Sequence, residues 1–316
     1  MNRKTFIGAS SIVGASLLAN VGKAVSSSRP LPVSSALTLP RLSELRRLAI
    51  CIPGEHAVGL NVTKVADAVR PANVVVKGHE AQQMMTLART VYQLEYADGT
   101  VMIDSGMDLE THRTFGKTEE PFYPENFETV QEALLQAKLI LFTHYHADHT
   151  AGVIRSPHFD KIAHKVWLTR DTADLLLHHP HKETVHIAED RLNRFVVADF
   201  SNCLPLAPGL VIWKTPGHTT DSKMLYIRLQ DGQEFIHSVD SGWSMQNILE
   251  MKMKNASWVK ENETQLLEQY RWLNEIMSEN PKLTVLCTHD NEQYERLRAD
   301  GILGSTLHTA ASQTKR

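Results

Sequence analysis

Short apolar runs separated by turn residues repeat along most of this chain. Two pairs of runs flank Asp-Gly turns: 91–95 with 101–104 around "YADGT", and 224–229 with 234–239 around "LQDGQEF". Because an Asp-Gly pair between apolar runs is typical of a tight hairpin turn, each pair predicts a β-hairpin. The two hairpins suggest two sheets.

Other apolar runs predict single strands and helices. The expected strands are 139–143, 165–169, 211–214 and 283–287, and the expected helices are 171–178 and 263–277. Strands and helices alternate, so an α/β fold is expected. Several chemically active residues follow strand ends, where loops on a rigid scaffold commonly carry functional groups.

The N-terminal segment has a different pattern. A basic start, Met1–Lys4, precedes the apolar stretch 5–21, and "VGKAVSS" offers small residues for cleavage near Ala24. This predicts an export signal over 1–24 and a periplasmic or secreted protein, without stable membrane insertion after cleavage. "NRKTFIG" is similar to a twin-arginine signal with Lys in place of the second Arg, so twin-arginine and Sec export both stay open. An uncleaved anchor is the alternative, since a spanning helix requires about 17–25 residues.

Composition narrows the classes of protein. The 316 residues are 42% hydrophobic and 22% charged, which is enough to bury one large core or two smaller ones. The formal net charge is -3 and no long Lys/Arg block occurs, so nucleic acid is not an expected partner. The cysteines at 51, 203 and 287 form no CxxC motif and allow at most one disulfide. Buried free thiols are expected, and the oligomeric state is left open.

The stretch "FTHYHADHTAG" concentrates His144, His146, Asp148 and His149 within six residues, directly after an expected strand. Histidines at alternate positions can aim two imidazoles at one ion, and the Asp and His after them can turn toward a neighbouring ion. Zinc accepts such nitrogen and oxygen ligands at about 2.0–2.2 Å, and a position left for water marks a catalytic site. Two metals need more ligands than this stretch provides.

The same stretch resembles the signature of the metallo-β-lactamase superfamily, whose members share a four-layer αββα sandwich with a metal site at the edge of its two sheets. Three further parts of the family pattern follow in order: "TPGHT", "SVDSG" and "LCTHD" supply His218, Asp240 and His289. The resemblance covers about 91–297. It implies a hydrolase domain over 86–316, preceded by an N-terminal extension and the start of the fold over 25–85.

The resemblance also implies a role for each ligand. The ligands would be His144, His146 and His218 for one zinc, Asp148, His149 and His289 for the second, and Asp240 as the bridge. The expected cofactor is therefore two Zn²⁺, although Mn, Fe or Co suit the same ligands. A hydroxide between the metals would attack the substrate carbonyl, and Asp148 would orient it.

Details of the pattern indicate a substrate class. True β-lactamases of the superfamily generally lack the bridging aspartate, and the diiron branch tends to carry Glu where this chain has His146. The stretch "NPKLTVLCTHDNEQYERL" is similar to the end of N-acyl homoserine lactonases, which implies hydrolysis of a lactone or a related small ester. The chain departs from the lactonases at Trp243, where they carry Tyr. Trp243 is expected to bind substrate, through its indole N–H or as the wall of an acyl pocket.

Several alternatives stay open. A β-lactam, thioester or phosphodiester hydrolase would use the same hydroxide, and a non-catalytic zinc-binding scaffold would keep the fold without turnover. The expected partner of the enzyme is a small-molecule substrate. Asp104 and Asp290 are each expected either to support a metal ligand or to be ordinary loop carboxylates. The histidines of "HHPHKETVH", 178–186, are expected to lie in a solvated loop and not in a second metal cluster.

Overall fold

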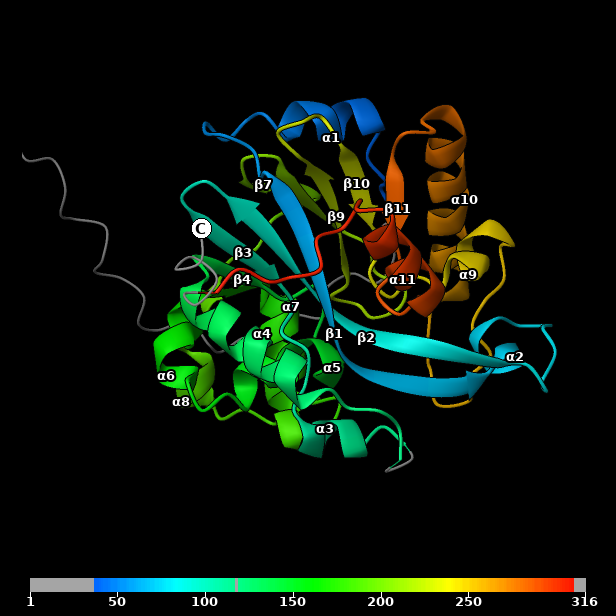
Figure 1. The fold of residues 1–316 in the computed structure, drawn as a ribbon, viewed down its shortest axis with the longest axis horizontal. Helices are drawn as coiled ribbons and strands as arrows, with labels where there is room; N and C mark the ends of the chain where they lie inside the picture. The colour runs from blue at the N-terminus through cyan, green and yellow to red at the C-terminus, as the bar shows by residue number, and fades with distance from the viewer. Residues whose placement is uncertain (1–36, 117–118, 310–316) are drawn as a thin grey trace, which may run out of the picture. The chain divides into compact units, whose positions relative to one another are not determined.

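Two sheets pack against each other in residues 37–116 and 119–309, the part of the chain that this computed structural model describes (Figure 1). The strands of the first sheet, in order across it, are β1 (Gly59–Pro71), β2 (Met84–Tyr96), β3 (Gly99–Ile103), β4 (Leu139–Leu141), β5 (Val166–Leu168) and β6 (Val196–Val197). Those of the second are β11 (Thr284–Leu286), β10 (Glu234–His237), β9 (Lys223–Arg228), β8 (Leu210–Lys214) and β7 (Cys203–Ala207).

Both expected hairpins are present. β2 and β3 pair antiparallel with Tyr96 opposite Gly99, and β9 and β10 pair antiparallel with Arg228 opposite Glu234. Beyond the hairpins the first sheet continues with parallel strands, β3 to β4 to β5 to β6, and β11 joins β10 in parallel in the second sheet. Parallel neighbours end at the same edge, so the loops after them lie side by side.

The alternation of side chains along each strand separates the layers. In β3, Val101 and Ile103 belong to the apolar cluster between the sheets, whereas Met102 faces the helices outside the first sheet. In β8, Ile212 joins the cluster between the sheets and Trp213 packs in the one outside the second sheet. Successive strand side chains point to opposite faces, so each sheet contributes to two cores. This arrangement is the predicted four-layer αββα sandwich.

Helices cover the outer face of each sheet (Figure 1). Outside the first sheet lie residues of α4 (Pro124–Gln136), α5 (Ala147–Ile154), α6 (Phe159–Ile162), α7 (Arg170–His178) and α8 (Glu189–Leu192). Outside the second sheet lie residues of α1 (Leu42–Leu48), α9 (Met245–Leu249) and α10 (Glu263–Glu279). The remaining short helices are α2 (Ala72–Val75), α3 (Leu109–Arg113), η1 (Ala163–Lys165), η2 (Glu183–Val185) and α11 (Asn291–Ala299).

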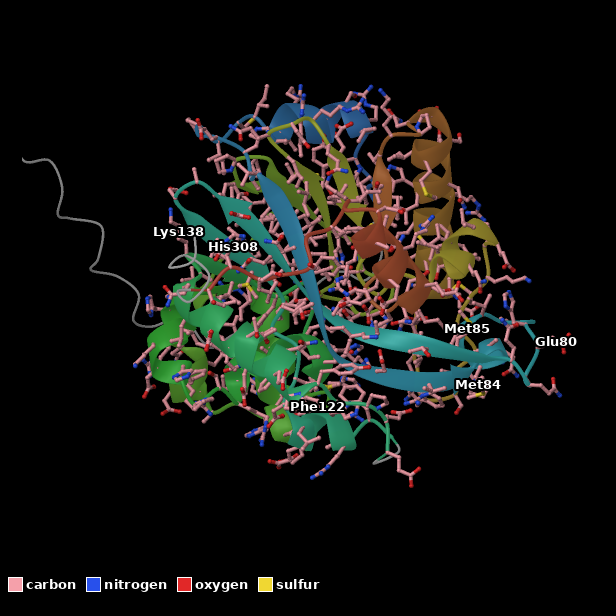
Figure 2. The ribbon with its side chains drawn as sticks, viewed as in Figure 1. Glu80, Met84, Met85, Phe122, Lys138 and His308 are labelled. Atoms are coloured by element: carbon pink, nitrogen blue, oxygen red, sulfur yellow. The ribbon has the colours of Figure 1, made fainter. Side chains whose placement is uncertain are left out.

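β1 and β2 form a long antiparallel ribbon that extends from the first sheet. α2 and the loop to β2 close its far end, where Figure 2 shows Glu80, Met84 and Met85. A bulge between Lys64 and Ala66 interrupts the pairing. The first strand of this sheet thus comes from the segment that precedes 86.

The expected export signal over 1–24 lies outside the described residues. Within 37–116 and 119–309, no helix is long and apolar enough to cross a membrane. All three cysteines are free, as predicted. Only Cys287 is buried, however: Cys51 is exposed in the loop after α1, and Cys203 is half-buried because it begins the edge strand β7.

Candidate metal centre

The histidine-rich stretch connects β4 to α5 at the edge of the first sheet. His144 lies in the loop after β4, and His146 is the residue that precedes the first turn of α5. Asp148 and His149 lie within that first turn, so the helix directs them to a different side from the loop histidines. All of them except the half-buried His146 are buried.

A first ligand group combines this loop with two others. One ligand atom each from His144, His146, His218 and Asp240 lies within 4.8 Å of the others. His146 Nδ1 and His218 Nε2 are 3.0 Å apart, and Asp240 Oδ2 lies 3.5 Å from His218 Nε2. His218 follows β8 and Asp240 follows β10, so the loops at the strand ends of both sheets meet here.

A second ligand group lies on the other side of Asp240. Ligand atoms of Asp148, His149 and His289 also lie within 4.8 Å of one another. Asp240 Oδ1 is 3.5 Å from His149 Nε2, and Asp240 Oδ2 is 2.9 Å from His289 Nε2. One carboxylate therefore faces both groups, which is the arrangement that the resemblance predicts for a bridging ligand.

Unsatisfied polar atoms indicate what these groups can hold. His144 Nε2, His149 Nε2 and Asp240 Oδ1 are buried and have no hydrogen-bond partner among the described residues. Buried polar atoms without partners are costly unless an ion or water satisfies them. Two nitrogens bound to one tetrahedral zinc would be about 3.3 Å apart, which is close to the separation of His146 Nδ1 and His218 Nε2. The residues present fit divalent metal ions.

The protonation states of the histidines and of Asp240 are compatible with metal binding. Burial, reinforced by neighbouring imidazoles, holds the pKa of His144 and His146 well below the usual range, so both rings are neutral and able to bind a metal. Burial raises the pKa of Asp240, but His289 and His149 outweigh it and keep that pKa low. Burial lowers the pKa of His149, but Asp104 and Asp240 outweigh it and raise that pKa. A metal ion there must therefore displace a proton from His149.

Asp104 supports the second ligand group. It follows β3 in the left-handed region, with φ 62°, and its Oδ2 accepts a hydrogen bond from His149 Nδ1 at 2.7 Å. The same carboxylate accepts from the backbone N–H and the hydroxyl of Thr143, each at 2.8 Å. This contact leaves His149 Nε2 facing the other ligands. Of the two roles expected for Asp104, the structure therefore favours support of a metal ligand.

Two charged residues that the sequence did not single out support the first group. Glu261 Oε1 lies 2.5 Å from His218 Nδ1, and Lys254 contacts Glu261 and donates to the backbone oxygen of Asp240 at 2.5 Å. Both side chains are buried. They come from the loop before α10, and no local motif marks them, because only folding brings them to His218.

The prediction of a solvated loop for 178–186 is wrong for one histidine. His181 Nδ1 accepts a hydrogen bond from the backbone N–H of Ala147 at 3.2 Å, and its ring centre lies 4.1 Å from that of His146. With His146 and Asp148 it forms a further group of potential ligands. His178, His179 and His186 are exposed, as predicted. Among the histidines of this segment, only His181 turns inward, where it packs against the start of α5.

Comparison with known proteins finds a family model that matches part of the chain. The model of the metallo-beta-lactamase superfamily matches residues 86–231, which include His144, His146, Asp148, His149 and His218. This match confirms the predicted resemblance to the superfamily over residues 86–231. Among curated protein sequences, none matches the chain.

Solved structures share the fold of this chain. A quorum-quenching N-acyl homoserine lactone lactonase is 16% identical, covers 77% of this chain and 97% of its own, and has a TM-score of 0.62. A probable metal-dependent hydrolase from Staphylococcus aureus is 14% identical, with coverages of 75% and 91% and a TM-score of 0.58. A dizinc quorum-quenching lactonase is 11% identical, with coverages of 75% and 90% and a TM-score of 0.53. Together with the family match, they confirm the prediction of a metal-dependent hydrolase.

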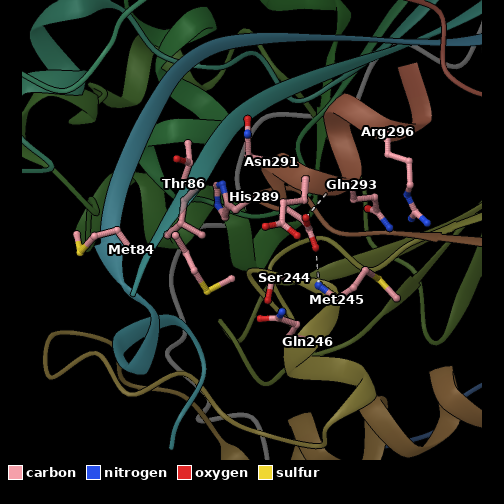
Figure 3. A pocket seen from close by; sticks show the side chains of 13 residues that line it. Met84, Thr86, Ser244, Met245, Gln246, His289, Asn291, Gln293 and Arg296 are labelled. Atoms are coloured by element: carbon pink, nitrogen blue, oxygen red, sulfur yellow. Dashed lines mark hydrogen bonds between the residues drawn. The ribbon is translucent and has the colours of Figure 1, made fainter. Parts of the chain in front are cut away.

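A cavity of about 440 Å³ opens beside this candidate metal centre (Figure 3). His289 forms part of its wall, and Asp290 lies next to it. The rest of the lining comes from the start of β2 and from the first residues of α9 and α11: Met84, Met85, Thr86, Leu87, Ser244, Met245, Gln246, Asn291, Glu292, Gln293 and Arg296. This volume lies in the range of small-molecule sites.

Trp243 and Asp290, which the sequence connected with the site, have packing roles. Trp243 packs against the apolar cluster around Val75 and Leu87, with Lys254 Nζ 5.3 Å from its ring centre, and does not belong to the cavity lining. Asp290 precedes α11 and accepts hydrogen bonds from the backbone N–H groups of Gln293 and Met245, each at 2.8 Å. Asp290 thus fixes two walls of the cavity without reaching a metal ligand.

Proposed function

We propose that this protein is a dinuclear metal hydrolase, with zinc as its metal, that opens a lactone or hydrolyses a related small ester. The observation that carries the proposal is the position of Asp240 between two ligand groups, each with an unsatisfied buried nitrogen. The fold similarity to lactonases, one of them described as dizinc, supports the same substrate class. A scaffold without turnover is disfavoured because all seven expected ligands converge.

The metal ions would supply an activated water and a positive charge for the carbonyl oxygen. His144, His146 and His218 would hold one ion, and Asp148, His149 and His289 the other. Asp148 Oδ2 faces His149 and His289, and this carboxylate would also orient the attacking water. Asp104 and Glu261 keep the outer nitrogens of His149 and His218 occupied, which fixes the orientation of both rings.

The cavity beside His289 would bind the part of the substrate that does not react. Methionine and leucine side chains on the β2 side suit a flexible acyl chain, since Met adapts its shape to irregular apolar ligands. The backbone and side-chain polar groups of α9 and α11 on the opposite side suit an amide or a ring oxygen. Trp243 would act behind this wall, by supporting Leu87, instead of contacting substrate as first expected.

The first experiment is an assay of lactone ring opening. Mature protein reconstituted with zinc is given short- and long-chain acyl homoserine lactones, with a β-lactam and a phosphodiester as controls, and Asp148→Asn is assayed in parallel. We expect metal-dependent opening of lactones that is lost in the variant. A fully metal-loaded protein that is inactive on lactones would contradict the proposed substrate class. Activity on the β-lactam or the phosphodiester would then identify that compound class as the substrate.

We also propose export, on the pattern of 1–24. Fractionation of cells that express the full chain, followed by N-terminal sequencing of the mature protein, tests this. Recovery from the periplasm or medium with a start near residue 25 is expected. An intact N-terminus in the cytoplasmic fraction would contradict it.

A further inference from the structure

Arg89 of β2 touches the metal ligand Asp148. Its Nη1 donates to Asp148 Oδ2, and that oxygen lies 3.6 Å from His289 Nε2 and 3.8 Å from His149 Nε2. The guanidinium therefore binds the same oxygen on which the second ligand group converges. A divalent ion in this group must share the oxygen with Arg89 or displace the guanidinium from it.

The fold holds Arg89 at this position. On either side of it, the backbone N–H of Ala88 donates to His289 O at 3.0 Å and the Thr90 hydroxyl donates to Thr288 O at 2.7 Å. The guanidinium also lies over the ring of Phe115, 4.6 Å from its centre, and the side chain is only 11% exposed. Rotation away from Asp148 would have to break this packing, so the charge stays near the second group.

The first ligand group has no equivalent cation on a ligand oxygen. The ammonium group of Lys254 lies 3.4 Å from His218 Nδ1 and donates to the backbone oxygen of Asp240, but its charge is paired with Glu261. Among the described residues, no Lys or Arg is paired with the side-chain oxygens of Asp240, whose ion-pair partners are all histidines. The two groups share Asp240 but differ in the charge that surrounds them.

We propose that Arg89 makes the two metal sites unequal, so that the second ligand group binds its ion more weakly than the first. This inference rests on the proposed two-metal function. A guanidinium keeps its charge at any ordinary pH, and a buried charge is screened little by salt, so it repels a nearby divalent ion. When less metal is present than two ions per protein, the first ligand group binds its ion, while Arg89 stays paired with Asp148 in the second group.

Metal titration of the purified protein tests the proposal without an activity assay. Protein stripped of metal is titrated with Zn²⁺ against a chromogenic chelator, which resolves two binding constants. We expect the wild type to bind the first equivalent at least tenfold more tightly than the second. Arg89→Met should tighten the second step at least tenfold and leave the first within threefold, because the competing charge is gone.

Two variants serve as controls. Arg89→Lys keeps the charge, so its second step should stay within threefold of the wild type. Arg46→Met removes an arginine that pairs with Glu234 on another part of the fold, and should leave both steps unchanged. Equal binding constants in the wild type, or a second step that is unchanged or weakened in Arg89→Met, would overturn the proposal. Failure of the first equivalent to bind would instead contradict the proposed metal hydrolase itself.

Discussion

Asp104 and His149 form a buried hydrogen bond, 2.7 Å from Oδ2 to Nδ1, that joins the end of β3 to the first turn of α5. The carboxylate lies at a residue with positive φ, and the next strand delivers Thr143 to its other oxygen. This arrangement turns His149 so that Nε2 faces Asp240. The orientation of the candidate ligand His149 thus depends on a residue outside both ligand groups.

Replacement of Asp104 by Asn tests this dependence. Asn tolerates the left-handed backbone conformation, so the loop is kept while the charge is lost. We expect zinc affinity to fall about 10- to 100-fold, as is typical when a carboxylate behind a metal-binding histidine is changed. The measurement is chelator competition, with thermal unfolding as the check on the fold. Unchanged affinity would show that His149 is oriented by other contacts.

Glu261→Gln removes the carboxylate shared by His218 and Lys254. Because Lys254 is buried, its charge is then left without an ionic partner, and the free energy of unfolding should fall by about 3 kcal/mol. The double variant Glu261→Gln/Lys254→Met should recover most of this loss, since it removes the buried charge. It should not recover the metal affinity, because the neutral amide at 261 no longer places a negative charge behind the His218 ring. Denaturant unfolding and metal titration measure the two effects separately.

Asp240→Ala should lower metal content and activity together, because both ligand groups lose the carboxylate that faces them. Metal content is measured by elemental analysis after dialysis, beside the hydrolysis rate. A variant that retains both metals at full occupancy would rule out the bridging role of Asp240.

Gly152→Ala should destabilise the protein by about 3 kcal/mol. A Cβ at this position would lie 1.9 Å from the backbone oxygen of Ser105, so α5 would have to move away from the loop that carries Asp104. Gly59→Ala is the matched control, since its Cβ would be 3.7 Å from the nearest side-chain atom. Denaturant unfolding of both variants gives the comparison. Equal stability of the two would show that α5 shifts without cost.

Thiol labelling should distinguish the three cysteines. A thiol-reactive disulfide should label the exposed Cys51 rapidly in the native protein. Burial raises the pKa of Cys203 to about 11 and also raises that of Cys287, so both have little thiolate at neutral pH. We expect Cys287, which is fully buried, to react only after unfolding. Its rapid labelling in the native state would indicate local opening of β11.

The sequence by itself determined the layers and singled out the candidate ligands that the structure brings together. Strand side chains alternate with a period of two, so residues such as Val101, Met102 and Ile103 already indicate which face each strand presents to which core. The ligands are close in sequence or follow strands in short motifs, so they could be recognised without coordinates. The pairing of β1 with β2 has no such local signal, and it was not predicted.

Only the tertiary structure decided what surrounds those ligands. Arg89, His181, Lys254 and Glu261 reach the metal centre from three separate segments, and Trp243 turns out to pack behind the cavity wall. A metal ligand needs a particular donor atom, which restricts the residue type and leaves a pattern in the sequence. A supporting charge needs only to be near in space, and many residues at many positions can provide it, so its identity appears only once the loops have packed together.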